Sequence, residues 1–251
     1  MTASHPDPNA SVDLDNFHVV AREPGHARRE LPVWACKATG AFAIDAGAPG
    51  EIERVDIAEV PAAWQLRNVL SDAECDRLVA LSEALGYDDD APVSLPRHIL
   101  HADNVTWVVD ESVDGAIWSR CKEFFAPSEY SSLKPLGLNP RFRFYRYGPG
   151  DYFASHADGA WPGSRVVDGR LVHDAYGDRL SELTFLLFLS DGYEGGRTMF
   201  RIGDGALAAV PTPKGAVLCF PHGSRPEHCI HGGETVEAGC KYIIRTDVLF
   251  G

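Results

Sequence analysis

Long apolar runs, a leader segment and an excess of cations are all missing from this 251-residue chain. No stretch approaches the roughly 18 consecutive apolar residues that a membrane-spanning helix requires. Residues 1–16 have neither the basic start nor the apolar segment of a secretory signal. Lys and Arg together number 23 against 36 Asp and Glu, and the net charge of −13 repels phosphate backbones. We therefore expect a cytoplasmic protein that binds neither membranes nor nucleic acid.

Paired cysteines are missing as well. The six cysteines form no Cys-x-x-Cys pair, which disfavours a cysteine zinc cluster. A disulfide framework is equally unexpected, because the chain is long and shows no sign of secretion. We expect six free thiols, most of them buried. They are Cys36, Cys75, Cys121, Cys219, Cys229 and Cys240.

The N-terminal quarter differs from the rest of the chain. Residues 1–60 show no sustained hydrophobic periodicity and are interrupted by proline and glycine. We expect an irregular arm that packs on the body, with the short apolar pieces Phe17–Val20 and Ala41–Ile44 as edge strands. Residues 61–251 are long enough for one large domain.

Two helices are expected before residue 130. Over residues 71–86, Ser71 and Glu74 form a capping-box pattern and Gly86 supplies a stop. Leucines at helical spacing give this segment one apolar face. A second helix is expected near 112–125, with its apolar side chains facing inward.

At residue 141 the hydrophobic period changes from helical to two. Over residues 141–147, Arg143, Tyr145 and Tyr147 share one face, and two phenylalanines lie on the other. Further strands, separated by Gly and Pro, are expected at 183–189, 197–202, 215–220 and 241–250. This order predicts a mainly β fold with flanking helices, in which an antiparallel barrel or double sheet carries the helices outside.

One histidine and one carboxylate follow the first of these strands. His156 and Asp158 are two residues apart, so on an extended backbone both side chains leave the same face. Together they supply two-thirds of the 2-His-1-carboxylate set that holds Fe(II), and His228 or His231 could complete it. This donor set contains no thiolate and therefore suits iron better than zinc. The alternative is a loop histidine bonded to its neighbour.

Two cations share a face of the last strand. Lys241 and Arg245 alternate with apolar residues, so both belong to the inner face of a half-buried strand. A buried cation needs an anionic partner, and a dicarboxylate ligand would supply one. For Arg245 an ion pair with Asp247 or another acid at the strand end is the alternative.

Taken in order, these motifs resemble the Fe(II)/2-oxoglutarate-dependent dioxygenases, and most closely their prolyl-4-hydroxylase-like branch. The resemblance covers about residues 64–250. It rests on His156-x-Asp158, Glu194-Gly-Gly-x-Thr198-x-Phe200, Pro213 with Gly215 and Phe220, His231, Gly239-x-Lys241-Tyr and Arg245-Thr-Asp-Val. Each motif alone is modest, and it is their order and spacing that are specific.

The resemblance implies a fold and a set of roles. The fold is a double-stranded β-helix, or jelly roll, which makes residues 61–251 the dioxygenase domain. Its iron ligands map onto His156, Asp158 and His231. The lysine that binds the far carboxylate of 2-oxoglutarate maps onto Lys241, with Tyr147 as its helper. Thr184 stands where the branch has a further hydroxyl, and Arg245 is a secondary contact to cosubstrate or substrate.

The resemblance also implies the reaction. Fe(II), 2-oxoglutarate and O2 are its cofactor and cosubstrates, and ascorbate is compatible with it. An unactivated carbon of a small molecule, a free amino acid or a peptidyl proline is hydroxylated, with release of succinate and CO2. A halogenase should lack the carboxylate ligand, whereas Asp158 is present. The alternative from another class is a non-catalytic, metal-binding or sensory jelly roll. The oligomeric state stays open.

The chain departs from the family pattern in two places. His222 and His228 crowd the distal histidine, although the Gly-Gly that follows and the spacing to Lys241 favour His231. The second departure is the long connection 159–180, which we expect to be a lid or binding loop. An ordinary surface excursion is its alternative.

Overall fold

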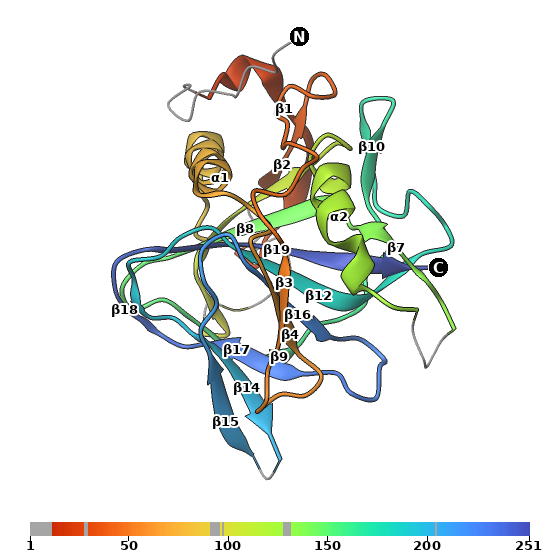
Figure 1. Ribbon diagram of the computed structural model, residues 1–251. Coiled ribbons are helices and arrows are strands. Elements are labelled where there is room, and N and C mark those ends of the chain that lie inside the picture. Colours follow the sequence, from red (N-terminus) through yellow and green to blue (C-terminus); the bar gives the residue numbers. More distant parts are fainter. Residues whose placement is uncertain (1–11, 28–29, 91–95, 97, 128–131, 204) are drawn as a thin grey trace.

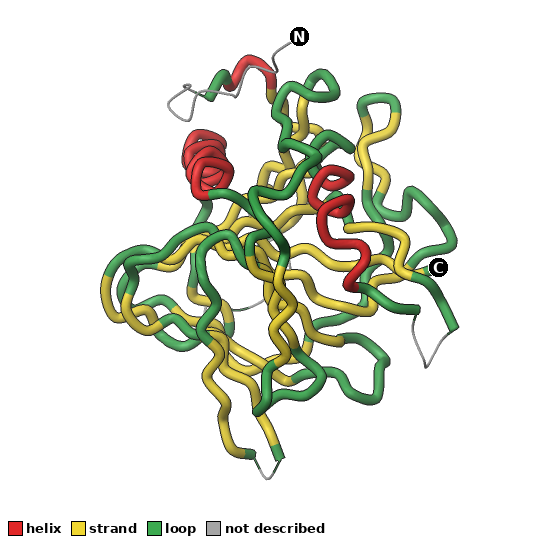
Figure 2. The backbone as a smooth tube through the Cα atoms, in the orientation of Figure 1, coloured by secondary structure: helices red, strands yellow, loops and turns green. Residues whose placement is uncertain are grey.

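The expected strands carry apolar residues on both faces, so both faces of their sheet must be covered. In the structure both faces are covered. A computed structural model describes residues 12–27, 30–90, 96, 98–127, 132–203 and 205–251. A large sheet crosses the middle of the molecule, with two helices above it and a smaller sheet below it (Figure 1). Figure 2 shows that both helices lie on the same side of the strands.

The helices and strands have the following bounds. The helices are α1 (Asp72–Leu85) and α2 (Asp114–Cys121), with 3-10 turns η1 (Leu14–Asn16) and η2 (Lys122–Phe124). The large sheet holds β1 (Phe17–Pro24), β2 (Glu30–Cys36), β6 (Asp103–Val108), β8 (Arg141–Tyr147), β19 (Lys241–Phe250), β12 (Leu180–Phe188), β16 (Val217–Pro221), β4 (Trp64–Arg67) and β3 (Glu53–Asp56) in that spatial order, and β7 (Pro135–Leu138) pairs with β19. The smaller sheet holds β15 (Ala206–Val210), β14 (Thr198–Ile202), β17 (Ile230–Gly233), β9 (Tyr152–Ala157) and β5 (Leu100–His101). Two short pairs are β10 (Arg165–Val167) with β11 (Arg170–Val172), and β13 (Glu194–Gly195) with β18 (Val236–Ala238).

The strand order identifies the architecture. Within the large sheet β8, β19, β12 and β16 are neighbours, and within the smaller sheet β15, β14, β17 and β9 are neighbours. The pairings among these strands are antiparallel, and the chain passes back and forth between the two sheets. This is the topology of a double-stranded β-helix, or jelly roll. The expected fold class is confirmed.

Both expected helices are present. Ser71 accepts a hydrogen bond from the amide of Glu74, whose side chain accepts from the Ser71 amide, so the capping box of α1 is complete. Gly86, at φ 88°, ends the helix. The second helix is shorter than expected, because α2 ends at Cys121 and continues as the turn η2. Among the described residues, neither helix is long and apolar enough to span a membrane.

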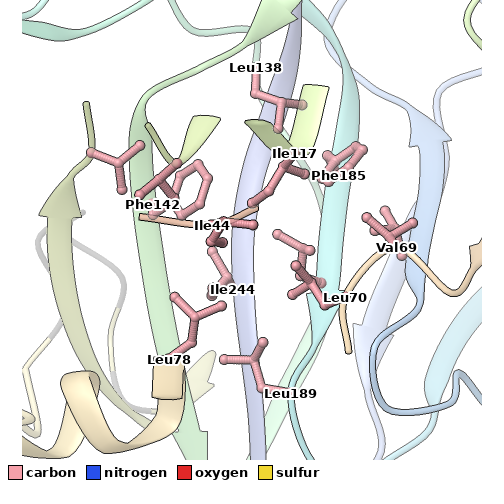
Figure 3. Packing of buried hydrophobic residues seen from close by; sticks show 14 of the residues in the cluster. Ile44, Val69, Leu70, Leu78, Ile117, Leu138, Phe142, Phe185, Leu189 and Ile244 are labelled. Carbon is pink, nitrogen blue, oxygen red and sulfur yellow. The ribbon is translucent and has the colours of Figure 1, made fainter. Parts of the chain in front are cut away.

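One core lies between the large sheet and the helices. Phe142 and Ile244 from the sheet, Leu78 from α1 and Ile117 from α2 are each fully buried in the same cluster (Figure 3). These strand residues are the apolar face that the period-two pattern predicts. Because side chains alternate along a strand, burial of this face directs the other residues of β8 and β19 into the space between the sheets.

The residues facing that inner space carry the polar groups. Tyr145 and Tyr147 of β8 lie in a second buried cluster with apolar residues of both sheets. Across the strand pair, Tyr147 is opposite Lys241, Tyr145 is opposite Ile243, and Arg143 is opposite Arg245. Strands β8 and β19 therefore place these three pairs of opposite residues side by side along the interior.

The N-terminal arm is not irregular as expected. Phe17–Val20 does form part of an edge strand, β1, and its partner β2 runs parallel to β6 at the margin of the large sheet. The expected strand at Ala41–Ile44 is wrong, because this segment is loop, although Phe42 and Ile44 are buried. Residues 1–11 lie outside the described part of the chain.

The long connection 159–180 contains structure of its own. Its middle forms the β10–β11 hairpin. Arg165 joins it to the body through Asp114, at 2.8 Å, and also donates to Tyr176, at 2.8 Å. The segment follows Asp158 in the sequence and, through Trp161 and Pro162, forms part of the wall of a cavity that β8 also lines.

Candidate metal centre

Two neighbouring strands of the smaller sheet bring three donors together. His156 lies on β9 and His231 on β17, and the two residues are direct cross-strand partners. Their imidazole rings are 4.4 Å apart, centroid to centroid. Asp158 follows the end of β9 and turns its carboxylate back toward both rings. The backbone pairing thus joins residues that are far apart in the sequence.

The distances fit one ion. The Nε2 atom of His156 is 3.5 Å from Oδ1 of Asp158, and Nε2 of His231 is 3.7 Å from Oδ2. One donor atom from each of the three residues lies within 4.8 Å of the others. Metal–ligand bonds of about 2.1 Å at right angles need donors roughly 3 Å apart, so small side-chain movements would close the set. Two imidazoles and one carboxylate form the facial set typical of non-haem Fe(II).

The backbone fixes which imidazole nitrogen faces the centre. Nδ1 of His156 lies 2.9 Å from the carbonyl oxygen of Ala154, and Nδ1 of His231 lies 3.3 Å from that of Cys229. A carbonyl accepts only, so each Nδ1 carries the proton and each Nε2 keeps a free lone pair. Outer hydrogen bonds of this kind orient histidine ligands in metal sites.

The charge states also suit a cation. Burial lowers the pKa of His231 to about 4, so its ring is neutral at pH 7. Burial acts to raise the pKa of Asp158, but the positive charge of Arg245 and the two histidines hold it well below its usual range. Neutral imidazole and ionised carboxylate are the forms that bind a metal.

Thr184 lies beside the centre but serves it differently from the expectation. Its hydroxyl donates to Oδ2 of Asp158 at 2.7 Å, and the side chain does not line the cavity that Lys241 lines. Nδ1 of His222 lies 2.7 Å from the same hydroxyl, and Nε2 of His222 is 2.8 Å from the hydroxyl of Ser181. Because the threonine proton points to Asp158, His222 must donate from Nδ1 and accept at Nε2.

The sequence presents His222 only as a competitor of the distal histidine. In the structure it is buried, and burial lowers its pKa, so the neutral ring can hold this chain of hydrogen bonds. The chain orients one oxygen of the metal-binding carboxylate. The resemblance points to Thr184, but nothing in the sequence places His222 behind it.

Lys241 forms the far end of the same cavity. The cavity has a volume of about 40 Å³, and Tyr147, His156, Asp158, His231, Lys241 and Arg245 are among its lining residues. The Lys241 ammonium donates to the carbonyl of Gly196 at 2.6 Å and lies 5.3 Å from the centre of the Tyr147 ring. Among the described residues no carboxylate lies within 4.0 Å of it, and the charge of Glu234 acts on it only from farther away. Burial lowers the pKa of Lys241 to about 8.

Arg245 has carboxylate partners instead. Its Nη2 is 2.9 Å from Oδ1 of Asp247, and its Nε is 3.4 Å from Oδ2 of Asp158. The ion pair with Asp247, one of the two alternatives from sequence, is therefore present. The contact with Asp158 was not expected, and it makes Arg245 the main source of positive charge beside that ligand.

His228 does not join the donors. Its side chain is exposed, and its Nδ1 lies 3.0 Å from the carbonyl oxygen of Arg225, on the approach to β17. The cluster of metal-type donors contains His231 instead. The spacing to Lys241 favours the same choice.

Comparisons with known proteins give structural likenesses only. No family model and no curated protein matches the chain. A viral collagen prolyl hydroxylase from Paramecium bursaria Chlorella virus-1, solved with 2OG, is 19% identical over 76% of this chain and 96% of its own, with a TM-score of 0.48. A Pseudomonas putida prolyl-4-hydroxylase is 15% identical over 74% and 91%, with a TM-score of 0.47. A 2OG-Fe(II) oxygenase family oxidoreductase from Burkholderia pseudomallei is 13% identical over 75% and 85%, with a TM-score of 0.48. At this level of similarity the function must be argued from the site residues.

The donor set makes a direct prediction about metal binding. His156→Ala, Asp158→Ala and His231→Ala should each abolish stable Fe(II) binding, because two remaining ligands cannot hold the ion. His228→Ala is the matched control and should bind Fe(II) like the wild type. Anaerobic loading, desalting and metal analysis measure this. Loss of iron from His228→Ala with retention in His231→Ala would reverse the assignment of the distal ligand.

A second prediction concerns the hydroxyl behind Asp158. Thr184→Val keeps the shape but removes the donor to the carboxylate, and should weaken Fe(II) binding by about 10- to 100-fold. Thr246→Val removes another buried hydroxyl, which donates to the carbonyl of Asn139. This control should lose stability without losing metal affinity. Competitive titration against a chelator of known affinity separates the two. Equal metal affinities for both variants would mean that Thr184 does not orient the ligand.

Proposed function

We propose that the chain is an Fe(II)- and 2-oxoglutarate-dependent dioxygenase that hydroxylates an unactivated carbon. One observation carries the proposal: the His156, Asp158 and His231 donors share a cavity with the buried cation of Lys241, which no carboxylate of the described residues contacts within 4.0 Å. A metal-binding set alone fits many proteins. A lone ammonium at the other end of the same cavity calls for an anionic ligand that reaches the metal.

The chain's own residues would divide the work. His156, Asp158 and His231 would hold Fe(II) on one side and leave its other positions free. Lys241 would bind the far carboxylate of 2-oxoglutarate with a charge-assisted hydrogen bond, and Tyr147 would line that end. When bound, the iron supplies the oxidative chemistry that converts 2-oxoglutarate and O2 to succinate, CO2 and a hydroxylated product. Arg245 would be a secondary contact to cosubstrate or substrate.

The cavity must open for this ligand. A volume of about 40 Å³ holds at most a few water molecules, so a five-carbon diacid needs side chains to move. Lys241 is the residue that can give way, because its ammonium would exchange the neutral carbonyl of Gly196 for a carboxylate. The exchange replaces a neutral acceptor by a charged one, which strengthens the hydrogen bond.

The proposal gives Thr184 a different role from the one that the resemblance implies. It acts on the ligand Asp158, together with His222, and not on the cosubstrate. Asp158 itself supports hydroxylation over halogenation, since its carboxylate completes the ligand set. A non-catalytic jelly roll remains the alternative from another class.

The proposal extends to the class of substrate and to the location of the protein. A small molecule, such as a free amino acid, and a peptidyl proline both fit a hydroxylase of this kind. All six cysteines are free thiols, which supports a reducing compartment such as the cytoplasm. We assign catalysis to residues 61–251, and the strands of residues 17–56 extend the same large sheet.

Turnover of 2-oxoglutarate tests the function. The purified chain should release succinate from 2-oxoglutarate only with Fe(II) and O2 present, and a panel of metabolites and peptides should stimulate that release. His231→Ala is the inactive control. Tight Fe(II) binding without any dependence of succinate on iron would favour the non-catalytic alternative.

A further prediction concerns the cosubstrate anchor. Lys241→Ala removes the only cation at that end of the cavity among the described residues, so bound 2-oxoglutarate would leave a carboxylate unpaired. The loss of roughly 2 kcal/mol or more should weaken 2-oxoglutarate binding by about 30-fold or more. Fe(II) should stay bound. Anaerobic titration of the metal-loaded protein gives the affinity.

Two controls sharpen this measurement. Lys214→Ala removes a lysine that pairs with Asp76 on the outside and should change nothing. In the wild type, 2-oxoglutarate affinity should fall as the pH rises past about 8, because Lys241 then loses its proton before binding. Lys241→Ala should lack this fall. If Arg245→Ala loses the cosubstrate and Lys241→Ala does not, the anchor is Arg245.

A further inference from the structure

A second, larger cavity adjoins β8, the strand that also lines the cavity of the metal donors. Its volume is about 280 Å³, and its wall includes Glu23, Arg141, Arg143, Trp161, Ser164 and His173. Arg141 and Arg143 come from β8, and Trp161 and Ser164 come from the long connection 159–180. The segment that the sequence marks as a lid or binding loop therefore forms one side of a cavity.

The β8–β19 pair connects the two cavities. Along the inner face of β8, Tyr147 lies beside Lys241, Tyr145 comes next, and Arg143 is opposite Arg245. Alternate residues on a strand are about 7 Å apart. The larger cavity thus begins at the end of the interior remote from Lys241. Arg245 marks the junction, since its Nε is 3.4 Å from the ligand Asp158.

Arg143 is the unusual group in this cavity. Only 5% of its surface is exposed, and its Nε has no hydrogen-bond partner. No carboxylate of the described residues lies within 4.0 Å of its guanidinium. Its one close neighbour of note is the ring of Trp161, 5.0 Å away. Burial, with the charges of Arg245 and Arg141, lowers the pKa of Arg143 to about 10. A buried cation without an anion is costly unless a ligand supplies one.

The neighbouring arginines are already neutralised. Arg141 forms a two-point ion pair with Glu23, and Arg245 pairs with Asp247 and Asp158. Among the described residues of this wall, Arg143 carries the one guanidinium charge that no carboxylate contacts within 4.0 Å, and Asp247 acts on it only from farther away. One such charge suits a monoanion, and the planar guanidinium fork matches a carboxylate. A dianionic phosphate would add a second negative charge close to Glu23.

We propose that Arg143 binds a carboxylate of the prime substrate, whose apolar body packs against Trp161. The inference rests on the proposed function, because it assigns the second cavity to the molecule that is oxidised. A cavity of about 280 Å³ is at the small end for a ligand site and suits a metabolite of amino-acid size. A proline within a peptide has no free carboxylate at that place. The substrate class is therefore a small carboxylic acid, free amino acids included.

Pairs of acids and their amides test the inference while the substrate itself is unidentified. The probes are acetate through hexanoate, the common L-amino acids, and the primary amide of each. Binding is measured by calorimetry and thermal shift on anaerobic protein loaded with metal and saturating 2-oxoglutarate. At least one acid should bind the wild type about tenfold or more tightly than its amide. Arg143→Met should remove the preference, and Arg143→Lys should keep part of it, because it keeps the charge but loses the fork.

The control variant and the cosubstrate measurement separate the outcomes. Arg201→Met removes an exposed arginine on β14 and should leave the preference intact. If no acid is preferred over its amide, or Arg143→Met prefers acids as the wild type does, the inference is wrong. If Arg143→Met loses 2-oxoglutarate, Arg143 serves the cosubstrate and the inference is also wrong. Absence of 2-oxoglutarate binding in the wild type would instead refute the proposed function.

Discussion

The register between β8 and β19 is the constraint on which the rest of the interior depends. Phe142, Phe144 and Ile244 face the helices and are fully buried in the core between the helices and the large sheet. The side-chain period of a strand is two, so their burial sends Arg143, Lys241 and Arg245 inward. A slip of one residue would expose the core and remove the cations from the cavities at the same time. Stability and site geometry are therefore fixed by the same pairing.

The interior holds charges that a purely structural core would avoid. Each buried carboxylate near the metal centre has a partner: Asp158 has Arg245, the histidines and a threonine hydroxyl, and Asp247 has Arg245. Two other inward cations, Lys241 and Arg143, have no carboxylate within 4.0 Å among the described residues, although Glu234 and Asp247 act on them from farther away. Proteins tolerate such groups where a ligand supplies the missing charge, and local exceptions to good packing tend to mark functional sites. The two exceptions here lie at different positions along the β8–β19 pair and line different cavities.

Much of the fold could be predicted from the sequence, because the capping box of α1 and the alternation in β8 are written in neighbouring residues. The spacing between His231 and Lys241 covers more of the chain, and it favours the histidine that the donor cluster contains. Contacts between distant segments could not be predicted from the sequence. The strand period turns Arg143 inward and the resemblance points to Thr184, yet their partners come from elsewhere: Asp158 from the end of β9, and Trp161 from a connection without a regular pattern. A strand pattern gives the direction of a side chain, whereas its role depends on what the rest of the chain places there.

The arrangement of charges also constrains where oxidation can occur. With one carboxylate held at Lys241 and another at Arg143, cosubstrate and substrate would not compete for one anchor. A substrate held by its carboxylate presents a carbon to the metal at a distance set by its own chain length, and reaction at a fixed centre depends on such positioning. The guanidinium of Arg143 would then fix the distance along the substrate at which oxidation occurs. Acids that are too short would occupy Arg143 without reaching the metal, so binding and hydroxylation would follow different dependences on chain length.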